Sequence, residues 1–150
     1  MPEASPVEVL LVEDQPQDLE LTLRALRKAG VHHRIQIARD GAEALDFLFS
    51  ESRQANGRFG SLPKVVVLDL KLPKVDGLEV LQELKRHPHT ETLPVVILTS
   101  SREPRDIARS YQLGVNSYIV KPVDCDGFSS TVQALGRYWL HLNHPPRLLA

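Results

Sequence analysis

Val65-Val66-Val67-Leu68-Asp69 is the stretch of sequence that decides the fold. Its apolar, mostly β-branched residues are typical of a short strand that is covered on both faces of a sheet. Asp69 then stands at the point where this strand ends. A carboxylate in that position is held rigidly by the strand and is still reachable from solvent, so we expect a reactive group there.

Strands and helices are predicted to alternate along the whole chain. Further strand-like runs lie at residues 7–12, 34–38, 94–98 and 117–120, and amphipathic helical patterns lie at 16–29, 40–48, 78–84, 103–113 and 124–142. Asp40 is a candidate N-cap, and Gly30 and Gly114 are candidate helix stops. Strict alternation predicts an α/β fold, in which right-handed crossovers build a five-stranded parallel sheet with helices on both faces.

The composition suits one domain with a substantial core. The chain has 150 residues, of which 42% are hydrophobic and 25% charged. Two prolines at 145 and 146 cannot continue a helix, so we assign residues 1–143 to the domain and 144–150 to a C-terminal tail. Residues 51–63 form a polar excursion to which no chemistry is assigned.

Charge and hydropathy exclude several classes of protein. The net charge of −1 and the scattered lysines and arginines argue against nucleic acid as a partner. No apolar stretch is long enough for a membrane span, and the first residues do not resemble a signal peptide. Cys125 is the only cysteine, which fits a reducing compartment. These features predict a cytoplasmic protein.

Polar residues follow four of the five predicted strands, namely Glu13, Asp14, Asp69, Thr99 and Lys121. In a parallel sheet these positions meet at one edge, where ligands of such folds bind. Three carboxylates placed together repel one another unless a cation lies between them, and an all-oxygen ligand set suits Mg²⁺. The Thr99 hydroxyl and the Lys121 ammonium would stabilise a phosphoryl group carried by Asp69, which becomes the candidate nucleophile.

Four motifs in this order resemble the receiver domain of two-component response regulators. They are Leu-Val-Glu-Asp at 11–14, Leu-Asp-Leu-Lys-Leu-Pro-Lys-Val-Asp-Gly at 68–77, Val-Ile-Leu-Thr-Ser at 96–100 and Tyr-Ile-Val-Lys-Pro at 118–122. The resemblance implies the flavodoxin-like (βα)5 receiver fold. Lys-Leu-Pro-Lys at 71–74, Ser-Tyr-Gln-Leu at 110–113 and Tyr138-Trp139 are similar to stand-alone regulators paired with phytochrome-type histidine kinases.

The resemblance implies how the phosphoryl group and the metal are bound. Asp69 would accept phosphate from a kinase histidine. Asp14, Asp69 and the main-chain carbonyl of Lys71 would bind Mg²⁺, and Glu13 would help through a water molecule. Lys71 is a departure from many relatives, which carry an uncharged residue there, so its positive charge bears on the lifetime of the phosphorylated form.

The resemblance also implies a conformational switch. Thr99 and Lys121 would hold the phosphoryl oxygens, and Tyr118 would swing between outward and inward rotamers. The Lys121–Pro122 bond would be cis, which would aim Lys121 into the site.

The protein is therefore expected to be a phosphoacceptor switch and not an enzyme, apart from self-catalysed phosphorylation and dephosphorylation. An intermediate phosphate carrier in a phosphorelay, or a phosphate sink, is the alternative. An aspartyl-phosphate hydrolase needs a second acid two residues after the nucleophile, where this chain has Lys71. A flavin-binding module needs a phosphate-cradling loop where this chain has Glu13-Asp14.

The last predicted helix has more apolar surface than one buried face uses. Phe128, Val132, Leu135, Trp139 and Leu142 repeat at α-helical spacing and predict the core stripe. Tyr138 and Leu140 project to either side of this stripe. We therefore expect a homodimer contact around Tyr138, Trp139 and Leu140, on the face of the last two helices and the C-terminal tail, including Leu148-Leu149.

Overall fold

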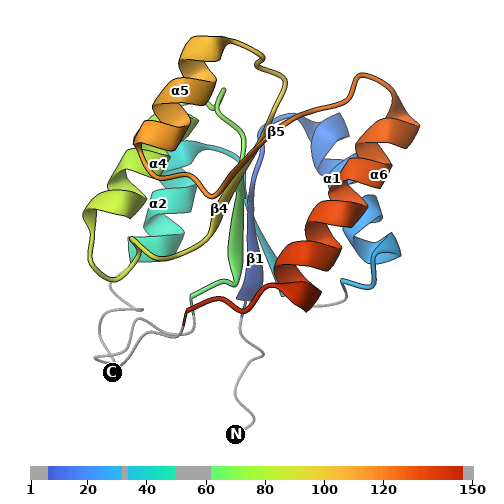
Figure 1. The fold of residues 1–150 in the computed structure, drawn as a ribbon, viewed down its shortest axis with the longest axis horizontal. Helices are drawn as coiled ribbons and strands as arrows, with labels where there is room; N and C mark the ends of the chain where they lie inside the picture. The colour runs from blue at the N-terminus through green and yellow to red at the C-terminus, as the bar shows by residue number, and fades with distance from the viewer. Residues whose placement is uncertain (1–6, 32–33, 50–61, 147–150) are drawn as a thin grey trace, which may run out of the picture.

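The computed structural model describes residues 7–31, 34–49 and 62–146. Its centre is a parallel sheet in the order β2-β1-β3-β4-β5, drawn edge-on in Figure 1. The strands are β1 (Val7–Val12), β2 (Arg34–Ala38), β3 (Val65–Leu68), β4 (Val95–Thr99) and β5 (Ser117–Val120). The predicted fold class is confirmed. Most of the excursion at 51–63, and Leu148-Leu149 of the tail, lie outside the described residues.

Helices cover both faces of the sheet, as Figure 1 shows. On one face lie α2 (Gly41–Phe49), α4 (Gly77–Arg86) and α5 (Pro104–Gln112), and on the other lie α1 (Pro16–Lys28) and α6 (Cys125–Gly136). None of the helices in the described ranges is long and apolar enough to cross a membrane.

Each face of the sheet has its own core, because successive side chains of a strand point to opposite faces. In β1, Leu10 and Val12 pack towards α2 and α4, whereas Val9 and Leu11 pack towards α1 and α6. All four residues of β3 are buried. The continuous valine run is therefore explained by burial on both faces of the central strand.

The predicted helix ends are present. The Asp40 carboxylate accepts a hydrogen bond from the amide of Glu43 at 2.8 Å, which caps α2. Gly30 and Gly114 follow α1 and α5 with φ of +84° and +100°, the left-handed conformation that commonly ends a helix. These stops turn the chain back towards the strands that follow.

The last helix departs from the sequence prediction in its final turns. After α6 the chain forms a π-helix, Arg137–Leu142, and the amide of Asn143 donates to the carbonyl of Tyr138, five residues earlier. The wider turn changes which side chains face the core: Leu140 is 6% exposed and Leu142 is 68% exposed. The prediction that Leu142 belongs to the core stripe was therefore wrong, because it assumed α-helical spacing throughout.

Truncation of the two leucines tests this change of spacing. Leu140→Ala is expected to lower the free energy of unfolding by about 2–5 kcal/mol, because it leaves a cavity in the core. Leu142→Ala serves as the matched control and is expected to change it by less than about 0.5 kcal/mol. Urea denaturation of both variants, at a protein concentration low enough for the chain to be monomeric, measures the difference. A larger loss in the Leu142 variant would show that the α-helix continues.

Candidate functional site

Neighbouring strands bring the acidic residues together. Val12 at the end of β1 lies opposite Leu68 at the end of β3, and the amide of Asp69 donates to the carbonyl of Val12 at 3.1 Å. The residues that follow are therefore adjacent across the sheet edge. One carboxylate oxygen from each of Glu13, Asp14 and Asp69 lies within 4.8 Å of the other two.

This acidic cluster fits a divalent cation. Its ligands are all oxygens, as Mg²⁺ and Mn²⁺ prefer. Asp14 Oδ1 is buried, and it has no hydrogen-bond partner among the described residues. A buried carboxylate oxygen without a partner costs free energy, and a bound cation would supply the missing partner.

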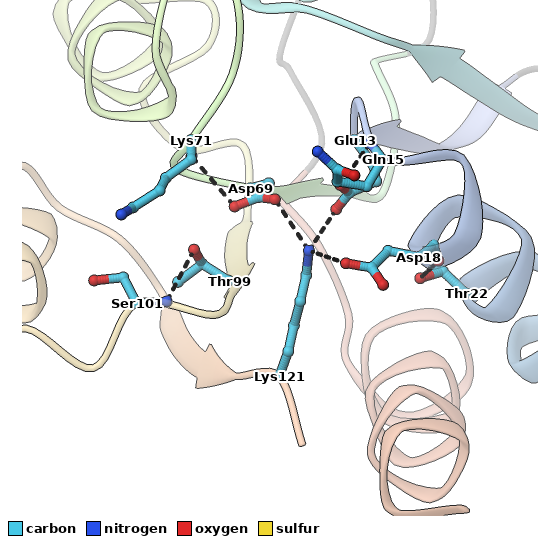
Figure 2. A network of polar contacts seen from close by, with 9 residues as sticks. All are labelled: Glu13, Gln15, Asp18, Thr22, Asp69, Lys71, Thr99, Ser101 and Lys121. Atoms are coloured by element: carbon cyan, nitrogen blue, oxygen red, sulfur yellow. Dashed lines mark hydrogen bonds and ion pairs between the residues drawn. The ribbon is translucent and has the colours of Figure 1, made fainter. Parts of the chain in front are cut away.

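Lys121 reaches the cluster from the end of β5, as Figure 2 shows. Its ammonium donates to Glu13 Oε2 at 2.8 Å, to Asp18 Oδ2 at 2.9 Å and to Asp69 Oδ2 at 3.0 Å. Its main-chain amide also donates to the carbonyl of Thr99 at 2.7 Å, which fixes the end of β5 beside the end of β4. Asp69 and Lys121 are therefore in contact, as the sequence predicted.

Burial and charge shift the ionisation of this cluster in the metal-free protein. Burial opposes the charge of Lys121, but its hydrogen bonds to Glu13 and Asp18 and the charge of Asp69 outweigh this effect and raise the pKa of the ammonium. Burial raises the pKa of Glu13 from 4.5 to about 7; the bond from Lys121 opposes this shift and the charge of Asp69 adds to it. Lys121 therefore stays charged at neutral pH, whereas Glu13 titrates near it.

Asp18 is a residue of the site that the sequence prediction missed. It lies in the first turn of α1, four residues after Asp14, and Figure 2 shows its carboxylate turned towards Lys121. The available signal was its place in the first turn of the helix that directly follows Glu13-Asp14, because that turn begins at the sheet edge where β1 ends.

Thr99 is linked to Tyr118 through Ser101. Thr99 is fully buried, and its hydroxyl oxygen accepts a weak hydrogen bond of 3.4 Å from the amide of Ser101. The Ser101 hydroxyl donates to the carboxylate of Asp106 in α5 at 2.5 Å. The Tyr118 hydroxyl donates to the carbonyl of Ser101 at 2.9 Å, and its ring packs against the core beneath α4. Burial raises the pKa of Tyr118.

Lys71 and Pro122 lie beside the site. The Lys71 amide donates to Asp69 Oδ1 at 3.3 Å, and its side chain is exposed and points away from Lys121 in Figure 2. The Lys121–Pro122 bond is trans, so the prediction of a cis bond was wrong. Trans is the isomer that X–Pro bonds favour, and the Lys121 side chain reaches Asp69 without the cis form.

The predicted dimer residues lie away from the site, in the π-helix that follows α6. Tyr138 is 49% exposed and stacks edge to face on Trp139, with ring centroids 5.0 Å apart. Trp139 is partly buried against the core. Leu140 is buried in that core and does not lie on the surface.

An acidic cluster, a lysine and a buried threonine at the carboxyl end of a parallel sheet define a phosphoacceptor site. The family model described as "Response regulator receiver domain" matches residues 9–133. The chain belongs to this family. Its members act as phosphoacceptor switches and not as enzymes, bind a divalent metal at an acidic pocket and interact with histidine kinases.

Relatives match nearly the whole chain. The probable methanogenesis regulatory protein FilR2 of Methanothrix harundinacea is 43% identical over 94% of this chain and 88% of its own length. Response regulator Rcp1 of Synechocystis is 38% identical over 90% of each chain.

Solved structures give the same fold. The Mn²⁺-bound form of Rcp1 superposes with a TM-score of 0.83 at 37% identity, covering 95% of this chain and 100% of that one. The bacteriophytochrome response regulator AtBRR has a TM-score of 0.68 at 54% identity, with the same coverage. The sequence-based assignment to receiver domains, close to regulators of the phytochrome type, is confirmed.

The raised pKa of Glu13 predicts how stability depends on pH without metal. The folded protein holds the Glu13 proton more tightly than the unfolded chain does. The resulting stabilisation is complete below pH 4.5 and is lost as the pH rises through about 7. In Glu13→Gln this loss is absent. Urea denaturation in EDTA across this pH range is expected to show a steeper decline for the wild type, and parallel curves for the two proteins would contradict the assignment.

Proposed function

We propose that this chain is a response regulator that receives a phosphoryl group on Asp69 from a histidine kinase in a Mg²⁺-dependent reaction. The observation that carries the proposal is the 3.0 Å contact between the Lys121 ammonium and Asp69 Oδ2, beside the carboxylates of Glu13 and Asp14. We assign residues 1–143 to the receiver domain and residues 144–150 to a C-terminal tail.

Phosphoryl transfer needs alignment and charge neutralisation more than covalent help from the protein. An oxygen of Asp69 attacks the phosphorus of the kinase phosphohistidine, the P–O bond forms and the P–N bond breaks. Lys121 and the Thr99 hydroxyl then hold phosphoryl oxygens. Asp14, Asp69 and the Lys71 carbonyl would hold Mg²⁺, with Glu13 assisting through water, and a bound ion supplies further neutralisation of phosphoryl charge.

The new charge is converted into a change of shape through Thr99. Charge-assisted hydrogen bonds contribute about 1.5–3 kcal/mol each, so the bonds from Thr99 and Lys121 supply at most about 3–6 kcal/mol, before any bond that Lys121 gives up is subtracted. A shift of a two-state equilibrium from 1:99 to 99:1 takes about 5.5 kcal/mol. Movement of Thr99 towards the phosphoryl group would carry the amide of Ser101 with it, and Tyr118, which is bonded to the Ser101 carbonyl, would repack.

The kinase is proposed to be of the bacteriophytochrome type. The likeness to Rcp1 and to AtBRR supports this pairing. Because such a kinase draws its phosphate from ATP, we place the reaction in the cytoplasm. The signal would pass on by protein–protein interaction, through the face around α5 and α6.

A phosphodonor experiment tests the acceptor. With Mg²⁺ and a small-molecule phosphodonor, and separately with a bacteriophytochrome-type kinase and ATP, the wild type is expected to gain about 80 Da, the mass of one phosphoryl group, in a hydroxylamine-labile form. Asp69→Asn is expected to gain nothing, because an amide is not a nucleophile towards phosphorus. Mass spectrometry of the intact protein measures the adduct.

Asp76→Asn is the matched control, since it removes the same charge seven residues away at the N-cap of α4, where Asn caps as well as Asp does. This control is expected to form the adduct as the wild type does. EDTA is expected to abolish adduct formation in the wild type. An adduct on Asp69→Asn would mean that another residue is the acceptor.

We also propose a homodimer contact at the end of the last helix, continuing onto the α5–α6 face and the tail. An apolar contact there is supported by the exposed part of Tyr138, the partly buried Trp139 and the exposed Leu142, which takes the place expected for Leu140.

Tyr138→Glu is expected to convert the dimer to a monomer, because a carboxylate would be buried without a partner in the interface. Gln82→Glu adds the same charge on the exposed side of α4 and is expected to leave the dimer intact. Sedimentation equilibrium measures both variants. A monomeric wild type, or a dimer in the Tyr138 variant, would contradict the proposed contact.

A further inference from the structure

The Lys121 ammonium has no hydrogen left for a phosphoryl group. An ammonium carries three N–H donors. Glu13, Asp18 and Asp69 accept one each, at 2.8, 2.9 and 3.0 Å. A phosphoryl oxygen on Asp69 can therefore gain a hydrogen bond from Lys121 only if one of these carboxylates gives its bond up.

The three carboxylates differ in how much a lost bond costs them. Asp69 itself becomes the acyl group that carries the phosphoryl group, so only Glu13 and Asp18 remain carboxylates. The side chain of Glu13 is 4% exposed, so loss of its bond would leave an unpaired buried charge. The side chain of Asp18 is 33% exposed, and water can replace Lys121 there. Of the two carboxylates that remain, Asp18 is therefore the partner that yields.

Asp18 also adds negative charge where the phosphoryl group must fit. Asp18 Oδ2 and Asp69 Oδ2 lie 2.9 and 3.0 Å from the same nitrogen, Lys121 Nζ, so these two oxygens are close to each other. Among the residues that the structure describes, Lys121 is the only side-chain partner of the Asp18 carboxylate. Asp18 therefore both occupies the lysine and repels an incoming anion.

We propose that Asp18 is a positioning residue that competes with the phosphoryl group for Lys121, and so sets how tightly the site holds that group. The inference rests on the proposed function at Asp69. In the unphosphorylated state Asp18 takes the donor that the phosphoryl oxygen later uses. Phosphorylation exchanges one Lys121 hydrogen bond for another and adds none.

Beryllofluoride, a stable mimic of a phosphoryl group on a carboxylate, measures this competition by calorimetric titration at saturating Mg²⁺. Asp18→Asn keeps the shape of the side chain and removes its charge. We expect it to bind beryllofluoride about five- to tenfold more tightly than the wild type, the effect of one partly solvated charge at this range.

Two controls separate competition from a general effect of charge or folding. Glu20→Gln removes the same charge from the same helix, where Glu20 pairs with Arg24 on the exposed side, and is expected to bind beryllofluoride like the wild type. Asp18→Glu keeps the charge at this partly exposed position, and is expected to restore wild-type affinity.

The outcomes distinguish this inference from the proposed function. If the wild type binds beryllofluoride and forms the adduct on Asp69, but Asp18→Asn binds no more tightly, the role of Asp18 is overturned and the proposed function stands. Tighter binding in Glu20→Gln as well would also overturn it. If the wild type neither binds beryllofluoride nor forms the adduct, the proposed function fails and the inference fails with it.

Discussion

The contact of one ammonium with three carboxylates is the interaction on which the site depends. It joins the residues directly after β1, β3 and β5 to a residue of α1 at a single nitrogen atom, Lys121 Nζ. Without this cation, Glu13 and Asp69 would be unpaired charges in a buried place, which is strongly destabilising. Yet one positive charge does not balance the carboxylates around it, and the unpartnered Asp14 oxygen adds to the excess. Lys121 therefore stabilises the cluster in the folded protein, but the cluster still carries more negative than positive charge.

A second connection leads from the site to the surface through the main chain. Tyr118 donates to the carbonyl of Ser101 and not to a side chain, so the tyrosine follows the path of the loop after β4. The Ser101 hydroxyl is bonded to Asp106, which ties the same loop to α5. A displacement at Thr99 therefore reaches α5 and Tyr118 together, because both are attached to one residue.

The sequence was sufficient for the fold and for most of the site, because parallel strands end at a common edge. The order of strands alone brought Glu13, Asp14, Asp69, Thr99 and Lys121 together. Asp18 was missed because its role depends on how α1 is rotated about its axis, which chain order does not specify. The trans Lys121–Pro122 bond was missed because a long, flexible side chain reaches Asp69 without a special backbone. The sequence prediction placed Leu142 in the core and Leu140 at the surface, the reverse of what the structure shows. An apolar pattern does not reveal where the hydrogen bonds of an α-helix change to those of a π-helix.

The π-helix at Arg137–Leu142 has a consequence for chain length. It holds Leu135 and Leu140 in one core although they are five positions apart in the sequence, where an α-helix would need a spacing of three or four. Deletion of one residue between them would restore ordinary spacing and bring the same leucine to the same place. Related chains can therefore differ by one residue in this segment and keep an identical core, so an alignment gap there would mark a change of helix type and not a change of fold.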